Sequence, residues 1–160
     1  MNVSGTALLP GTPQQVWDLL TAPQRLVKLL PGCERLEPDG PDRYKAMIKF
    51  GLAAISGNYS GTLQLTDKNQ PNSLRLSIEG KGLAGFVKGQ GELVLAQTPP
   101  RSPSQNQTSV QTQTEVTYTG EAQVGGMIAS VGQRMIEATA KKIIQQFFES
   151  AAKELSQTAK

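Results

Sequence analysis

The sequence predicts an α+β fold in which a curved antiparallel sheet of about seven strands wraps round one long C-terminal helix. Two observations carry this prediction. Apolar and polar residues alternate over most of residues 43–124, as in strands with one buried face. In residues 126–160 the apolar spacing changes to three or four, which is typical of an amphipathic helix. A sheet with one apolar face needs a cover, and only this helix is long enough.

The chain opens with a short strand and two short helices. Residues 2–9 alternate in polarity and are expected to form a half-buried strand. Thr12 is a suitable N-cap, and Gln15 three positions later completes a capping box. Apolar residues then indicate one short helix ending near residue 20 and a second over residues 23–30.

Short turns rich in Gly, Pro and Asn separate the following strands, which favours an antiparallel meander. Residues 98–110 hold three prolines and many Ser, Gln, Asn and Thr, so they are expected to form a flexible loop. Strand patterning resumes after this loop, and residues 1–160 are therefore interpreted as a single domain. The final helix is expected to be unbroken and to bury a face from Ile128 to Leu155.

Composition excludes several classes of function. The 160 residues include no histidine and one cysteine, Cys33, so Ser-His-Asp and Cys-His catalytic groups, a disulfide and a multi-Cys metal site are excluded. The net charge of +3 is spread along the chain, which argues against a nucleic-acid partner. No apolar run approaches the roughly 18 residues that span a membrane. No catalytic residue, metal or cofactor is predicted, and the expected location is the cytoplasm.

Small residues on the predicted inner face are the most informative feature for function. By strand parity, Gly61 and Gly120 share the face of the core Leu and Ile residues, and Gly132 falls on the opposing helix face. Such small residues either let the elements approach closely or leave a cavity between them. The residues expected to line that cavity are Ala46, Ile48, Tyr59, Gly61, Leu63, Leu76, Phe86, Tyr118, Gly120, Ala122, Gly132, Met135 and Ile136.

The glycine-rich stretch at residues 80–87 has the pattern GxGxxGxV, as in a dinucleotide-binding turn. Strand residues follow it instead of a helix, so a dinucleotide site is rejected. The glycines are attributed to a sharply bent strand pair or a bulge. The alternative is a flexible entrance loop with Phe86 at its tip as a gate.

Two sets of polar side chains leave alternatives open. Tyr59 and Tyr118 fall on the apolar face, where each hydroxyl needs a partner, either backbone at the rim or the polar head of a ligand. Arg43, Lys45 and Lys49 form a row on the outer face. This row is either solvated or a docking surface for an acidic partner or anionic lipid.

Four short motifs give the chain a resemblance to a known family. They are LPxxPxxVW at residues 9–17, LPGCE at 30–34, GKGLAGFVKG at 80–89 and AQVGG at 122–126. With the order of elements, they resemble the carbon monoxide dehydrogenase G-subunit family, within the START/Bet v 1-like, or helix-grip, superfamily. The similarity runs from residue 3 to about residue 155, and residues 98–110 resemble a lineage-specific insertion.

The resemblance implies binding and not catalysis. The family is associated with molybdenum-containing carbon monoxide dehydrogenases and their relatives, and is implicated in their membrane association or electron hand-over. The superfamily stores hydrophobic ligands between sheet and helix. The implied protein is thus a non-catalytic carrier of a lipid or quinone, with molybdenum hydroxylase subunits as partners and peripheral contact at the inner membrane face. Two alternatives stay open: an enzyme resembling the polyketide cyclases or hydrolases of this superfamily, and a pure adaptor without ligand.

Overall fold

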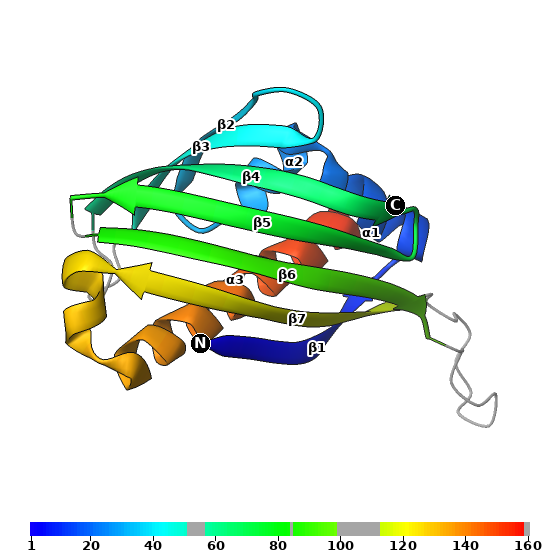
Figure 1. Cartoon of the computed structure of the whole chain (residues 1–160). Helices are drawn as coiled ribbons and strands as arrows, with labels where there is room; N and C mark the ends of the chain where they lie inside the picture. The colour runs from blue at the N-terminus through cyan, green and yellow to red at the C-terminus, as the bar shows by residue number, and fades with distance from the viewer. Residues whose placement is uncertain (51–56, 84, 99–112, 159–160) are drawn as a thin grey trace.

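The computed structural model describes residues 1–50, 57–83, 85–98 and 113–158. Beyond Thr98, the predicted flexible loop lies outside these residues. The elements, shown in Figure 1, are β1 (Asn2–Pro10), α1 (Pro13–Thr21), α2 (Pro23–Leu29), β2 (Cys33–Pro38), β3 (Arg43–Phe50), β4 (Gly57–Asn69), β5 (Ser73–Gly82), β6 (Gly85–Gln97), β7 (Gln113–Gly125), the 3-10 helix η3 (Gly126–Val131) and α3 (Gln133–Thr158).

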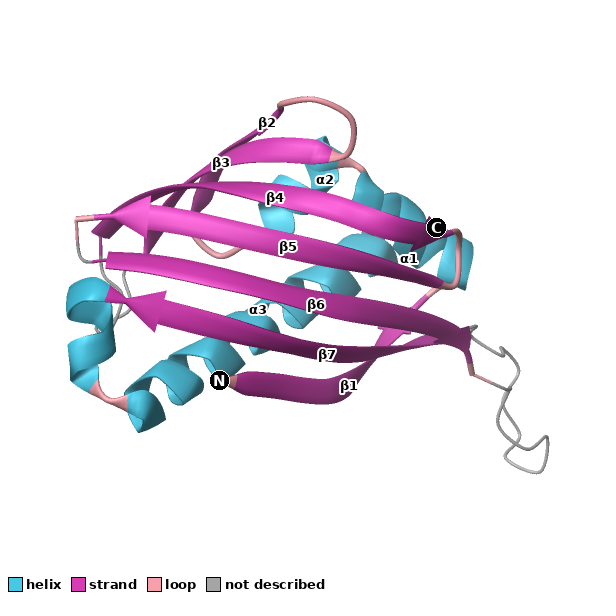
Figure 2. Ribbon diagram, in the orientation of Figure 1, coloured by secondary structure: helices cyan, strands magenta, loops and turns pink. Residues whose placement is uncertain are grey.

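The seven strands form one antiparallel sheet in the order β1-β7-β6-β5-β4-β3-β2. From β2 to β7 each strand pairs with its neighbour in sequence, and β1 closes the order beside β7. The helices α1, α2 and α3 lie on one face of this sheet, which we call the inner face, and η3 lies at the end of β7 (Figure 2). The predicted fold class and meander are confirmed.

The capping box at the start of α1 is formed as predicted. The backbone N–H of Gln15 donates to the Thr12 hydroxyl oxygen at 3.2 Å, and the Thr12 N–H donates to Gln15 Oε1 at 2.8 Å. These two bonds satisfy backbone donors that the first helical turn leaves unpaired. The helix then turns Val16 and Leu19 into the interior, where both are fully buried.

The core between sheet and helices has two unequal parts. Residues of the larger part come from α1, α2, the C-terminal half of α3 and the adjoining strand ends; they include Leu9, Val16, Trp17, Leu19, Leu26, Leu65, Leu74, Leu95, Val116, Ala151 and Leu155. Each fully buried leucine in such a cluster stabilises the fold by about 1.5–3 kcal/mol. The smaller part, at the opposite end, centres on Tyr59 and Ile128.

The prediction of one unbroken helix from Ile128 is wrong at its start. Ile128 is buried, but it belongs to η3, and α3 begins only at Gln133. Between them Gly132 has a φ of 97°, a conformation that favours glycine, so the chain changes direction there. The apolar spacing continues through both helices, which is why the pattern did not reveal the break. From Ile136 to Leu155 the predicted buried face is confirmed at Ile136, Ala151 and Leu155.

Candidate functional site

The inner face of the sheet is closed at one end and only partly covered at the other, where Tyr59 and Ile128 are buried but their surroundings are not. Under α1 and α2, Leu74 and Val116 are almost completely buried. Toward η3, Ile78 is 40% exposed, although its pairing with Leu63 and Gly89 places it on the same inner face. A bulky apolar side chain that faces the interior yet remains exposed marks the accessible half of this face.

The long helix α3 runs diagonally across the inner face, from the β1 and β7 edge toward α1 and α2 (Figure 1). Its main backbone contacts are with β1, α1, α2 and η3 (Figure 1). Beside Ile78 on β5, Gly80 also belongs to the inner face, because it pairs with Gly61 and Val87. Among the described residues, a Cβ built on Gly80 would meet no heavy atom within 4 Å. Open space therefore lies directly over this part of the strand.

Two other inner-face glycines allow close approach between strands. A Cβ on Gly61 would overlap the carbonyl oxygen of Glu79 on β5. A Cβ on Gly120 would lie 2.9 Å from the carbonyl oxygen of Gln90 on β6. Small residues on this face were expected either to allow close approach or to leave a cavity. At these two positions the structure favours close approach. Gly80 is different, because its missing side chain leaves room instead of relieving a clash.

Most of the predicted lining residues share the inner face. The strand pairings put the following on that face: Ala46, Ile48, Tyr59, Gly61, Leu63, Leu76, Tyr118, Gly120 and Ala122. Ile136 is buried on α3. Sequence reasoning named neither Ile78 nor Gly80 as lining, although strand parity already placed Ile78 on this face. Their accessibility depends on where α3 lies, so no local signal could have shown it.

Three predicted lining residues lie elsewhere. Phe86 belongs to strand β6 on the outer face, where its ring covers Gly125, so its prediction as a gate at a loop tip is wrong. Gly132 and Met135 are exposed, so their prediction as part of the interior lining is also wrong. The change of direction at Gly132 explains both of these errors.

A hollow of about 460 Å³ opens near these residues, at the end of β7 and the start of α3. It is lined by Met1, Phe86, Ala122, Gln123, Val124, Ala129, Gln133 and Ile136. It brings together three predicted site residues, Phe86, Ala122 and Ile136, from two neighbouring strands and from α3. The accessible half of the inner face and this hollow lie at the same end of the sheet.

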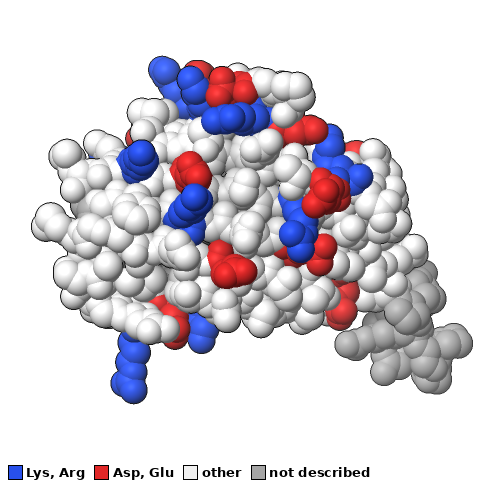
Figure 3. Space-filling view, viewed as in Figure 1, with Lys and Arg blue, Asp and Glu red and all other residues white. Residues whose placement is uncertain are grey.

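A second hollow, of about 470 Å³, lies on the outer face and was not predicted. Its lining is mostly polar: Asn2, Ser4, Thr66, Asp67, Arg75, Ser77, Gln90, Glu92, Thr119 and Glu121, with the backbone of a few inner-face residues. Arg75 and Glu92 form an ion pair across it at 3.7 Å. Figure 3 shows acidic and basic side chains interspersed over this face. Such a surface suits water better than a hydrophobic ligand.

The inner face offers little chemistry for catalysis. Thr114 is the one polar residue that is fully buried among the described residues, and its hydroxyl donates to the carbonyl oxygen of Gly11 at 2.9 Å. Burial raises the pKa of the Tyr59 phenol, which therefore stays protonated at neutral pH. Burial likewise raises the pKa of the Cys33 thiol, so a reactive thiolate is not favoured. In the part of the chain that the structure describes, no acidic cluster could hold a metal ion.

A curved antiparallel sheet round a long C-terminal helix, with two short helices after the first strand, defines the helix-grip, or Bet v 1-like, class of ligand-binding folds. Within that class, the chain belongs to the carbon monoxide dehydrogenase G-subunit (CoxG) family, whose family model matches residues 5–156. The resemblance drawn from the motifs is confirmed. No curated protein matches the chain.

Solved structures agree with this assignment. The chain is 36% identical to a conserved protein from Geobacillus kaustophilus, with a TM-score of 0.87 over 99% of this chain and 97% of that one. The Zhui aromatase/cyclase from Streptomyces sp. R1128 has a TM-score of 0.64 at 13% identity, over 100% of this chain and 96% of the other. That likeness shows a shared fold alone. None of the described helices has the length and apolar character needed to span a membrane.

Proposed function

We propose that this protein is a non-catalytic carrier that holds a hydrophobic small molecule, a lipid or a quinone, against the accessible half of its inner face. The observation that carries the proposal is the exposure of Ile78 beside the open space over Gly80. Covering apolar surface is favourable by about 25 cal/mol per Å², and an apolar ligand would provide that cover.

Membership of the CoxG family supports a partner enzyme for this protein. Because the family is named for carbon monoxide dehydrogenase, we infer that this protein serves a molybdenum-containing enzyme of that type or a relative. The carrier would then aid the enzyme's membrane association or its electron hand-over. A diffusing quinone or lipid would link the two roles, because it is soluble in the bilayer and fits an apolar site.

The apolar character of the site favours a carrier over an enzyme. A cyclase or hydrolase needs an acid or base placed inside the cavity with a pKa near the working pH. The described strand residues of the inner face supply the hydroxyls of Tyr44, Tyr59, Tyr118 and Thr114, and the raised pKa of Tyr59 makes it a poor acid at neutral pH. The fold likeness to an aromatase/cyclase does not supply the missing groups.

Native mass spectrometry of the purified full chain, followed by solvent extraction, tests the proposal. We expect a bound apolar compound whose removal frees a site for a naphthalene sulfonate dye. A protein that carries no extractable compound and binds neither dye nor an added quinone or fatty acid would be an adaptor and not a carrier. Turnover of an added polyketide substrate would instead support the enzyme.

A further inference from the structure

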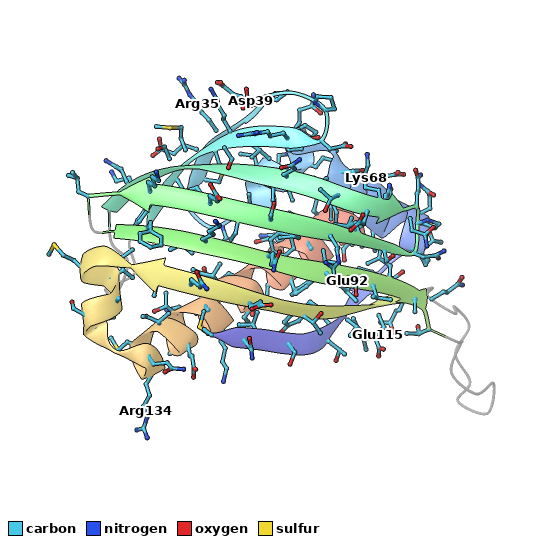
Figure 4. All side chains as sticks on the ribbon, viewed as in Figure 1. Arg35, Asp39, Lys68, Glu92, Glu115 and Arg134 are labelled. Atoms are coloured by element: carbon cyan, nitrogen blue, oxygen red, sulfur yellow. The ribbon has the colours of Figure 1, made fainter. Side chains whose placement is uncertain are left out.

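The two edge strands of the sheet, β1 and β2, are built differently. Strand β2 is six residues long, and its register against β3 shifts between Cys33 and Arg35. It also carries further charged side chains and a terminal proline: Glu34, Glu37 and Pro38. Figure 4 shows Arg35 projecting from this edge. Charges, proline and irregular register are the usual features that keep an edge strand from pairing with another chain, so the β2 edge is protected.

The opposite edge strand, β1, lacks this protection. It is nine residues long, contains no charged side chain, and pairs with β7 in one continuous register. It stands first in the strand order, so among the described residues no strand lies on its other side (Figure 1). Helix α3 contacts β1 from the inner face of the sheet. A long, regular and uncharged edge strand is a template for pairing with a further strand.

Hydrogen-bonding groups of the β1 backbone point out of the sheet at alternate residues. The Met1 amino group donates to the carbonyl oxygen of Ala122 at 3.1 Å, and the Ala122 N–H donates to the Met1 carbonyl oxygen at 2.9 Å. Because the two sides alternate along an antiparallel strand, the N–H and C=O groups that point away from β7 belong to Asn2, Ser4, Thr6 and Leu8. All four residues are exposed, including the apolar Leu8.

We propose that β1 pairs antiparallel with β1 of a second copy of this chain, so that the sheet continues across a two-fold axis. With Ser4 opposite Thr6 of the second copy, and Asn2 opposite Leu8, every outward N–H and C=O group of these residues has a partner. Leu8 of each copy then lies beside Asn2 of the other, at the margin of the 470 Å³ outer hollow, where its exposure is lower. This inference does not rest on the carrier function.

The distribution of charge favours a second copy as the occupant. An uncharged strand offers nothing to an acidic or basic peptide, whereas a second β1 matches it in length, regularity and lack of charge. The nearest acidic residues on the outer face of β7 are Glu115 and Glu121. Across the proposed pairing, Glu121 of one copy and Glu115 of the other are three strand spacings apart, about 14 Å. That separation exceeds the Debye length of about 8 Å at physiological ionic strength, so their repulsion is screened.

Sedimentation velocity of the full chain tests the pairing. We expect a dimer whose fraction grows with protein concentration up to about 100 μM, as for a dissociation constant in the micromolar range. In Ser4→Lys/Thr6→Lys the new lysines face one another across the axis, and the dissociation constant should rise by about tenfold or more. Gln64→Lys/Gln90→Lys is the matched control, because both glutamines are exposed on the outer face away from β1. Thermal melting verifies that each variant stays folded.

A variant with opposite charges tests the register. Ser4→Lys/Thr6→Glu puts a lysine of each copy opposite a glutamate of the other, so we expect the dimer to persist or to become tighter. If Thr6 instead lay opposite Thr6 of the second copy, two glutamates would meet and the dimer would weaken.

Three results would overturn the proposal. One is a parent chain that stays monomeric over this concentration range, as an edge made for a strand of another protein would. Another is a dimer that Ser4→Lys/Thr6→Lys and Gln64→Lys/Gln90→Lys affect equally, since its interface would lie elsewhere. The third is loss of the dimer in Ser4→Lys/Thr6→Glu, which would contradict the pairing of Ser4 with Thr6. Dye binding of the monomeric variants is measured separately, so the carrier function stands or fails independently of the dimer.

Discussion

The ring of Tyr118 in β7 stacks on the ring of Phe148 in α3, with centroids 5.3 Å apart and planes inclined by 28°. The Tyr118 hydroxyl lies over Gly5 of the neighbouring strand, where a Cβ would be 2.5 Å from its oxygen. The contact joins α3 to β7 and β1. It requires glycine at position 5, because a side chain there would overlap the Tyr118 phenol. Tyr118 is therefore part of the wall between sheet and helix, whatever it offers to a ligand.

Replacing Gly5 should disturb this contact. In Gly5→Val the new side chain overlaps the Tyr118 phenol, which has to leave its position beside Phe148. We expect a loss of about 1–3 kcal/mol in the free energy of unfolding, measured by denaturant titration. Ser4→Val on the outer face of the same strand is the control and should change little. Equal stability of the Gly5→Val and Ser4→Val proteins would contradict the assigned role of Gly5.

Filling the space over Gly80 should block the carrier. Gly80→Leu places a side chain where no heavy atom of the described residues lies within 4 Å of the Cβ position, so we expect unchanged or higher thermal stability together with weaker dye binding. Ser77→Leu, on the outer face of the same strand, should leave dye binding unchanged. A destabilised Gly80→Leu protein with normal dye binding would count against a site at this place.

Substitution at Gly132 tests the break between η3 and α3. Its φ of 97° is unfavourable for side chains, although open space surrounds it. Gly132→Leu should therefore lower the free energy of unfolding by about 1–2 kcal/mol through backbone strain, without altering dye binding. Gly132→Asn should be destabilised to a similar extent, because a φ of 97° with a ψ of 152° lies outside the left-handed helical region that asparagine tolerates. A stabilised leucine variant would show that the chain runs on as a regular helix.

The buried face of α3 can be tested near its C-terminal end. Ala151 is completely buried, whereas Lys153 two positions later is exposed. Ala151→Asp would bury a charge without a partner, and we expect a loss of about 3–5 kcal/mol in the free energy of unfolding. Lys153→Asp should have a far smaller effect. Scanning calorimetry of both variants measures the difference. Similar melting of the two variants would mean that the helix face is assigned wrongly.

Stability at alkaline pH should depend on Tyr59. Burial raises the pKa of its phenol above the ordinary value of 10.0, so above about pH 10 the unfolded chain loses this proton more readily than the folded one. The resulting contribution to stability is complete below that pH and is lost as pH rises through the folded-state pKa. Tyr59→Phe should flatten this alkaline decline in a denaturation series. Both the parent protein and the Tyr59→Phe variant should carry Cys33→Ser. The pKa of the Cys33 thiol is also raised by burial, and its titration would otherwise add to the alkaline decline.

Local patterns in the sequence determined the order of the elements and the face on which most strand residues lie. The capping box of Thr12 and Gln15 acts over three residues, and strand parity puts Ile48 opposite Tyr59 on the inner face as expected. These features depend on neighbouring residues or on a period of two. They were therefore predictable from the sequence, and so was the CoxG family, through four short motifs.

Only the tertiary structure decided how open the inner face is and where α3 begins. The break at Gly132 is invisible to periodicity, because Ile128 and Ile136 keep helical spacing across it. Phe86 lies on the outer face because the β5–β6 turn sets the phase of the strand that follows. The exposure of Ile78 depends on the path of α3 across the sheet, a long-range relation that no stretch of sequence contains.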